Sequence, residues 1–166
     1  MIRRPPRSTL SSSSAASDVY KRQCLLLVNL YGLYKSNNFA AIAVHDPPVD
    51  FETLVKEEMV YQGFPAFLFY PTAHYSRIFM GVNITKVVPA TALPLGNKQP
   101  ILIFNGMLDE RILPHHSLDL VELADSLGIE TELYRYEDVG HVGSLWAYTD
   151  EFERLIVQFF NENLAS

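Results

Sequence analysis

The chain has 166 residues, of which 48% are hydrophobic and 19% charged, and its formal net charge is −6. Such a chain is long and apolar enough for one globular domain with a sizeable core, which excludes a disordered or fibrous protein. The acidic balance supplies no broad basic surface, so we expect neither nucleic acid nor a membrane surface as a partner. The single cysteine, Cys24, excludes an internal disulfide. The oligomeric state and the compartment stay open, with the cytoplasm slightly favoured.

The first 23 residues differ in kind from the rest, because basic residues and serines stand where core-forming side chains would be expected. A signal or transit peptide is one interpretation, but Lys21 and Arg22 abut the next apolar run and no small-residue cleavage pattern follows it. Met1–Gln23 resembles instead a translated sequencing adaptor. We therefore interpret residues 1–23 as a foreign or disordered leader. The apolar run 24–34 is shorter than the ~20 residues that span a bilayer, so we expect no membrane segment.

Apolar runs and helical patterns alternate from Cys24 onward. Leu25–Lys35 is apolar on nearly all sides and ends in Ser-Asn-Asn, which is typical of a buried helix. The run FAAIAVH, ended by Asp46 and two prolines, predicts a strand over 39–45 that is buried on both faces. The run PILIF predicts a second strand of the same kind over 100–104.

The last third of the chain continues the alternation. Leucines and an alanine at helical spacing predict a helix over 114–127, with Pro114 in its first turn and Gly128 as its C-cap. A third strand is predicted over 130–136 and a closing amphipathic helix over 150–164. Strands that alternate with helices of this length pair in parallel through right-handed crossovers. The predicted fold class is therefore α/β, with a partial doubly wound parallel sheet.

Residues 50–98 form an insertion that does not keep this rhythm. Phe51–Tyr61 has a helical pattern, and residues 64–80 are crowded with aromatic side chains. The insertion is either a cap over a pocket or a set of helices packed on the sheet edge. Any single aromatic is expected in the core, where most aromatics lie. For the insertion as a whole we favour a helical cap.

Chemistry-bearing residues follow two of the predicted strands. Asp109 comes shortly after the strand 100–104, and His141 comes after the strand 130–136. Ligands of parallel α/β sheets bind beyond the carboxyl ends of the strands, so one crossover sets these two residues side by side. A carboxylate beside a histidine fixes its tautomer and stabilises the imidazolium, as a general base acting on a serine requires. The sequence thus predicts an acid and base pair, Asp109 and His141, that needs a nucleophile.

The other histidines give weaker signals. His115 and His116 are adjacent in a first helical turn, where neighbours point about 100° apart, so we expect capping or surface roles and no joint metal site. His45 and Asp46 end a strand and are candidates to line the pocket. No phosphate-binding glycine loop and no zinc-ligand spacing occurs, so no cofactor and no metal are expected.

The stretch from PILIF to the C-terminal helix resembles the C-terminal portion of an α/β-hydrolase. The matching residues are the strand with Gly106, Asp109 and Pro114, then the strand with Gly140-His141 and the last helix. FAAIAVHDPPVDF resembles the strand and turn before the cap in the serine aminopeptidase and prolyl-oligopeptidase-like branches, and CLLLVNLYGLYKSNN resembles the helix after the nucleophile. The resemblance covers residues 24–166 and implies the last three strands of the fold, with Asp109 as the acid and His141 as the base.

The sequence departs from that family at the nucleophile. The family's serine lies in a G-x-S-x-G turn between a strand and a helix, and this sequence contains no G-x-S-x-G. Ser36, Ser117, Ser144 and Cys24 lack that context. We therefore expect a fragment whose nucleophile and oxyanion donors are missing, inactive as written.

Two functions remain open for the parent protein. The first is a serine hydrolase that cleaves carboxylic ester or amide bonds of small-molecule or peptide substrates. The alternative is a non-catalytic hydrolase-fold protein that serves binding or interaction. The presence of both Asp109 and His141 favours the hydrolase.

Overall fold

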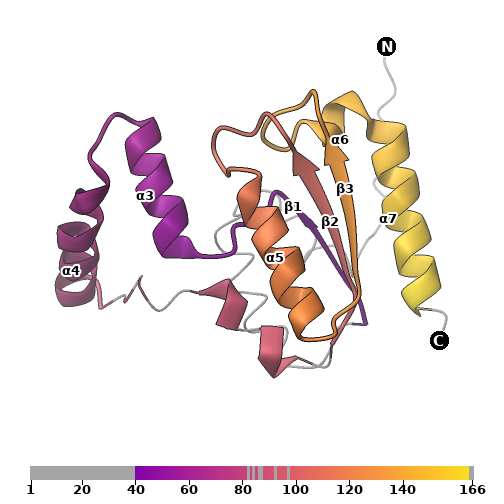
Figure 1. The fold of residues 1–166 in the computed structure, drawn as a ribbon, viewed down its shortest axis with the longest axis horizontal. Coiled ribbons are helices and arrows are strands. Elements are labelled where there is room, and N and C mark those ends of the chain that lie inside the picture. Colours follow the sequence, from indigo (N-terminus) through magenta and orange to yellow (C-terminus); the bar gives the residue numbers. More distant parts are fainter. Residues whose placement is uncertain are drawn as a thin grey trace, which may run out of the picture.

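The computed structural model describes residues 40–164 except 82, 84, 86, 87, 92 and 97. The proposed leader 1–23, the predicted helix 25–35, Cys24 and Ser36 lie outside the described residues. Three strands of the described part, β1 (Ile42–His45), β2 (Ile101–Gly106) and β3 (Thr131–Tyr136), form one parallel sheet in the order β1-β2-β3 (Figure 1). The predicted α/β class and parallel pairing are confirmed.

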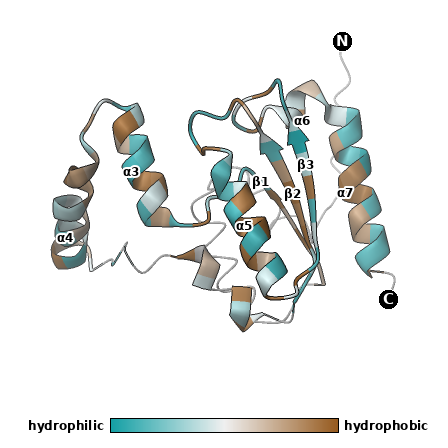
Figure 2. Ribbon diagram, viewed as in Figure 1, coloured by the Kyte–Doolittle hydropathy of each residue, from teal (hydrophilic) through white to brown (hydrophobic). Residues whose placement is uncertain are grey.

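Alternate residues of β2 face opposite sides of the sheet, as the two-residue repeat of a strand requires. Ile101 and Ile103 belong to one hydrophobic cluster, and Leu102 and Phe104 belong to another. All six residues of β2 are buried, because β2 is the central strand and is covered on both faces. Figure 2 shows hydrophobic residues following one another along this strand.

Helices cover both faces of the sheet. Helix α5 (His115–Ser126) contributes Leu120 and Ala124 to the cluster of Ile101 and Ile103. Helix α7 (Thr149–Leu164), preceded by the short α6 (Ser144–Ala147), covers the other face (Figure 1). Its apolar face repeats at helical spacing, as Figure 2 also shows, and contributes Phe152, Leu155 and Phe159. Each buried Phe or Leu stabilises the fold by roughly 1.5–3 kcal/mol.

The insertion contains helices α3 (Phe51–Tyr61) and α4 (Phe69–Phe79), with short 3₁₀ turns η1 (Ala66–Leu68), η3 (Pro89–Thr91) and η4 (Leu93–Leu95). Helix α3 has the predicted bounds, and the Asp50 carboxylate caps it by accepting the N–H groups of Glu52 and Thr53. Helices α3 and α4 lie to one side of the sheet (Figure 1).

The expectation of core positions for the aromatic residues of the insertion is wrong for most of them. Phe69 is fully buried, but the other large aromatic side chains of α4 and its approaches are more than half exposed. The physical reason is that α4 packs against α3 and η1 rather than on the sheet. The exposed aromatic residues are Tyr61, Phe64, Phe67, Tyr70, Tyr75 and Phe79.

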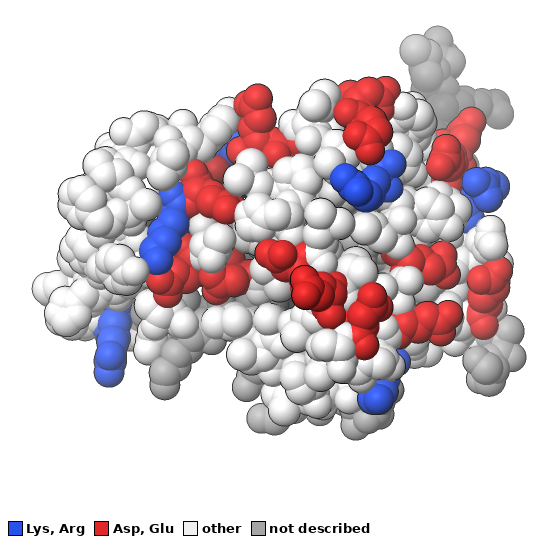
Figure 3. Space-filling model, in the orientation of Figure 1, with Lys and Arg blue, Asp and Glu red and all other residues white. Residues whose placement is uncertain are grey.

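The surface reflects the negative net charge. Acidic side chains dominate the face over α5 and α7 in Figure 3, and few basic side chains lie among them. Among the described residues, no helix has both the length and the apolar character that crossing a bilayer requires.

Candidate active site

Polar side chains meet where the three parallel strands end. Asp46 follows β1 directly, Asp109 lies in the loop after β2, and His141 lies in the loop between β3 and α6. Parallel strands present their carboxyl ends at one edge of the sheet, so the three loops converge there (Figure 1).

The structure brings the two predicted site residues, Asp109 and His141, into contact. Nδ1 of His141 lies 2.7 Å from Oδ2 of Asp109. A carboxylate only accepts, so Nδ1 carries the proton and donates it to Asp109, which leaves the Nε2 lone pair on the opposite side of the ring. The Asp109 side chain is fully buried, whereas that of His141 is 29% exposed. The pair therefore has a buried acid and an imidazole that reaches the surface.

The second oxygen of Asp109 is held by the backbone of its own loop. Oδ1 accepts the N–H groups of Arg111 and Ile112, at 2.8 and 2.9 Å. These bonds fix the carboxylate so that Oδ2 points at His141. The bond from Asp109 raises the pKa of His141, burial opposes this, and the charges of Asp109 and Asp46 add to the rise. The arrangement stabilises the imidazolium, which is the form a general base reaches after it takes a proton.

Glycines let the Asp109 and His141 loops pack directly on each other. A Cβ on Gly106 would lie 2.7 Å from the carbonyl oxygen of Gly140 and 2.8 Å from that of Val139. A Cβ on Gly143 would meet the Val139 Cβ at 2.8 Å. The sequence VGHVG around His141 thus serves a close backbone approach, which a larger residue would prevent.

Asp46 and His45 also lie at this edge of the sheet, as the sequence suggested. Asp46 is fully buried and accepts the N–H groups of Gly106 and Val142, at 2.9 and 2.8 Å. Nε2 of His45 lies 2.9 Å from Oγ of Ser144. Burial, together with the nearby charge of His141, lowers the pKa of His45 to about 4, although the charge of Asp109 opposes this. His45 is therefore neutral near pH 7.

Of the nucleophile candidates that the sequence analysis weighed, Ser117 and Ser144 lie in the described part of the chain, and neither is placed as a nucleophile. Ser144 is fully buried and its hydroxyl pairs with His45 rather than with His141. Ser117 is buried within α5. Asp46, Asp109 and His141 have ligand atoms close enough together to hold a metal ion. Nδ1 of His141, however, carries a proton in its hydrogen bond to Asp109, so it has no lone pair for a metal.

The expectation that His115 and His116 are both capping or surface residues is wrong for His116. Its ring is fully buried and its Nε2 lies 2.9 Å from Glu57 of α3, and Nε2 of His115 reaches the other oxygen of the same carboxylate at 2.8 Å. The two rings stack with centroids 4.3 Å apart. The reason is that Glu57 of α3 reaches both rings, a contact that the sequence of α5 alone does not show.

The ligand atoms of Glu57, His115 and His116 lie close enough together to hold a metal ion. The hydrogen bonds of His116 nevertheless favour a protonated Nε2, which is unable to bind a metal. The Val49 N–H donates to Nδ1 of His116 at 3.4 Å, so the proton of this ring lies on Nε2, and the Nε2–H group donates a hydrogen bond to Glu57. A metal ion bound at Nε2 of His116 would require that Nε2 carry no proton and that Nδ1 carry one. The proton on Nδ1 would then face the N–H of Val49, which is itself a donor. Burial lowers the pKa of His115, but its bonds to Glu57 and Asp119 outweigh this and raise it. The cluster thus joins α3 to α5 through two imidazole rings that share the carboxylate of Glu57.

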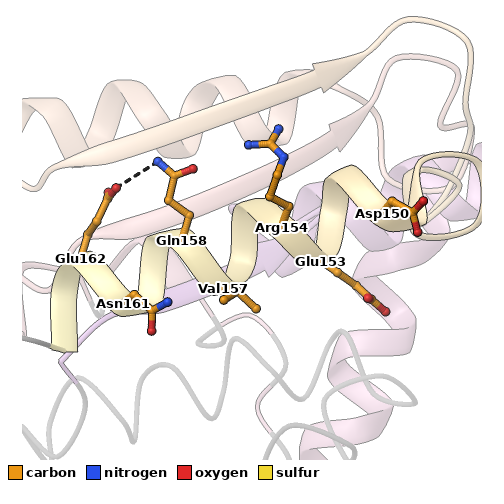
Figure 4. Close-up of a pocket in the computed structure, with 7 residues that line it drawn as sticks. All are labelled: Asp150, Glu153, Arg154, Val157, Gln158, Asn161 and Glu162. Carbon is orange, nitrogen blue, oxygen red and sulfur yellow. Dashed lines mark hydrogen bonds between the residues drawn. The ribbon is translucent and has the colours of Figure 1, made fainter.

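The described surface also has a shallow pocket, which lies along α7 between Asp150 and Glu162 (Figure 4). Its lining residues all come from that one helix, and Gln158 and Glu162 bond to each other there. A single helix encloses no ligand, and none of the site residues lines this pocket. We assign it no role.

Solved structures with the same fold place the chain in a class. An acylaminoacyl peptidase of Pyrococcus horikoshii superimposes with a TM-score of 0.62 at 16% identity, over 82% of this chain and 22% of that one. An esterase of Pyrococcus furiosus superimposes with a TM-score of 0.58 at 18% identity, over 82% of this chain and 50% of that one. The chain therefore spans about a fifth of the peptidase and half of the esterase. No curated protein sequence matches it.

The parallel sheet with α5 and α7 on its two faces is thus the C-terminal portion of the α/β-hydrolase fold. Within this class the chain belongs to the prolyl oligopeptidase family, which residues 26–166 match. This confirms the resemblance that the sequence showed and gives the chain a serine-hydrolase fold of the peptidase-like branch.

Proposed function

We propose that the protein is the C-terminal part of a serine hydrolase that cleaves carboxylic ester or amide bonds of small-molecule or peptide substrates. Asp109 is the acid and His141 the base of its catalytic triad. The observation that carries the proposal is the 2.7 Å contact between Nδ1 of His141 and Oδ2 of Asp109, at the carboxyl ends of neighbouring strands.

The proposed chemistry follows from the protons of this pair. A serine hydroxyl placed at Nε2 of His141 gives its proton to that lone pair as the oxygen attacks the substrate carbonyl. Asp109 stabilises the imidazolium, which then protonates the leaving alcohol or amine. The serine and the oxyanion donors come from a segment outside this sequence, since it has no G-x-S-x-G.

We also propose that the insertion 50–98 is a cap that shapes the acyl or peptide pocket. Glu58 of α3 accepts two bonds from the Arg111 guanidinium, both at 3.0 Å, and Arg111 is two residues from Asp109. This contact links the insertion to the loop of the acid. The exposed aromatic side chains of the insertion offer apolar surface to a substrate.

Two experiments test the proposed function. The 166-residue chain incubated with a fluorophosphonate probe and a p-nitrophenyl ester is expected to show neither labelling nor turnover. Labelling of one serine, with turnover abolished by His141→Ala, would contradict the proposal that this chain lacks the nucleophile.

The second experiment uses the longer chain encoded with the contiguous upstream sequence. We expect it to hydrolyse ester or amide substrates, and we expect Asp109→Asn to lower kcat by about 10³–10⁴-fold because the imidazole loses the partner that fixes its tautomer. An upstream strand-to-helix turn in which another residue replaces the serine of G-x-S-x-G would favour the alternative, a non-catalytic protein of this fold.

A further inference from the structure

A third side chain, the buried carboxylate of Asp46, lies beside the proposed pair and has no part in the proposed proton transfer. Asp46 directly follows β1, is 0% exposed and has φ 44°, a left-handed conformation that Asp tolerates better than most residues. Its Oδ1 accepts the Gly106 N–H at 2.9 Å and the Asn105 side-chain amide at 3.3 Å. These bonds fix the carboxylate against the end of β2.

The other oxygen of Asp46 reaches the loop of the proposed base. Oδ2 accepts the Val142 N–H at 2.8 Å, and this N–H belongs to the peptide bond that follows His141. Val142 has φ 48°, which is strained for a β-branched side chain. A strained residue persists where its surroundings hold it, and the bond to Asp46 is such a restraint.

Asp46 also places charge near His141 without taking its proton. Its Oδ2 lies 4.0 Å from Nδ1 of His141, which is too long for a hydrogen bond, whereas Asp109 lies at 2.7 Å. Burial raises the pKa of Asp46 to about 6, although the N–H groups of Gly106 and Val142 lower it. Near pH 8 the carboxylate is therefore ionised. The titratable groups that face it are His45, Asp109 and His141.

We propose that Asp46 is a positioning residue, which holds the strained peptide after His141 so that the imidazole meets Asp109 and which adds negative charge beside that imidazole. This rests on the proposed function, because it matters only if His141 is the base. The residue acts through His141 and touches no reacting atom.

The test is an NMR titration of the His141 ring in the 166-residue chain. Asp46→Asn keeps the tolerance for positive φ at position 46 but removes the charge, and its amide presents an N–H where a donor now bonds. We expect the pKa of His141 to fall by about one unit. As a matched control, Asp138→Asn removes an exposed carboxylate of the same β3–α6 segment that bonds Tyr148, and is expected to leave the pKa of His141 unchanged. An Asp46→Asn variant with the pKa of the unaltered chain would overturn the proposal.

Two further measurements separate the possible failures. Asp109→Asn in the same titration tests the proposed function: an unchanged His141 pKa there sinks the acid and base pair, whereas a fall there but none in Asp46→Asn sinks only the role of Asp46. Hydrogen exchange of the Val142 amide is measured in the unaltered chain, so this test does not depend on whether a variant folds. Slow exchange supports the bond to Asp46, and exchange as fast as that of an exposed loop amide overturns it.

Discussion

Nε2 of His45 lies 3.5 Å from Oδ2 of its neighbour Asp46, and its hydrogen-bond partner is Oγ of Ser144. The ring also packs against Phe104 and Phe152, with centroids 6.0 and 5.3 Å away. Burial of this kind disfavours the charged form of an imidazole, which is why the pKa of His45 is lowered to about 4.

The lowered pKa of His45 predicts a loss of stability in acid. Between pH 6.5 and about 4 the unfolded state binds the proton that folded His45 refuses, so the free energy of unfolding falls as pH is lowered through this window, by up to about 3 kcal/mol. His45→Gln is expected to remove this fall, as measured by urea unfolding at pH 7.5 and 5. His74→Gln, an exposed imidazole of α4, is the control and is expected to keep it. An equal pH dependence in the His45 variant and the parent would contradict the prediction.

The raised pKa of Asp46 acts in the opposite direction over nearly the same window. Folded Asp46 holds a proton that the unfolded chain releases between pH 3.8 and about 6, so its contribution to stability falls as pH rises through that range. The free energy of unfolding of the unaltered 166-residue chain therefore depends less steeply on pH than the contribution of His45 alone would give. The difference between the parent and His45→Gln isolates the histidine.

The close approach of the two site loops predicts a cost for Gly106→Ala. The new Cβ would lie 2.7 Å from a backbone oxygen of Gly140, which no side-chain rotation relieves. We expect a loss of about 1–3 kcal/mol in the free energy of unfolding, together with a shifted His141 ring resonance. Gly140→Ala, whose Cβ would lie 3.2 Å from the Leu108 oxygen, is expected to cost less. Equal stability of Gly106→Ala and the parent would show that the loops are not in contact.

The junction between α3 and α5 predicts unequal roles for two neighbouring glutamates. Glu57→Ala leaves the buried imidazole of His116 without its acceptor, and we expect a cost of about 1–3 kcal/mol in urea unfolding. Glu58→Ala removes an exposed ion pair with Arg111, which is worth about 0–1 kcal/mol. If both variants lost the same stability, the bond to His116 would not hold the junction.

Two aromatic residues of the insertion, two positions apart, predict a sharp contrast in stability. Phe69 is 0% exposed and Phe67 is 65% exposed. Phe69→Ala is expected to cost about 3–5 kcal/mol through a cavity, and Phe67→Ala within about 0.5 kcal/mol. Thermal unfolding followed by circular dichroism measures both. A large loss in the Phe67 variant would mean that this side chain is covered by other residues.

The sheet and its helices follow from patterns that are local in sequence. Helix α3 matches its prediction, and β3 lies within its predicted range. The strand predicted over 100–104 continues to Gly106, because Asn105 and Gly106 pair with Arg135 and Tyr136 of β3. Such an extension depends on a partner strand, so the apolar run PILIF alone does not reveal it.

The contacts of the site are predictable only where topology determines them. Asp109 and His141 follow adjacent strands, and that order was enough to expect them together. The bonds of Asp46 join residues 60 and 96 positions away, and the bond between His116 and Glu57 spans 59 positions. No periodicity encodes such pairs. The position of Asp46 directly after a buried strand was the only signal that pointed to it.

The three segments that meet at the Asp46 carboxylate are distant in the chain, and this has a consequence for biosynthesis. Closing loops of that length costs entropy that local structure does not return, so the three-way contact at Asp46 forms only after β1, β2 and β3 have all docked. A nascent polypeptide whose residue 142 has not yet left the ribosome lacks the bond from the Val142 N–H to Asp46, so Asp46 does not yet hold the loop that contains His141.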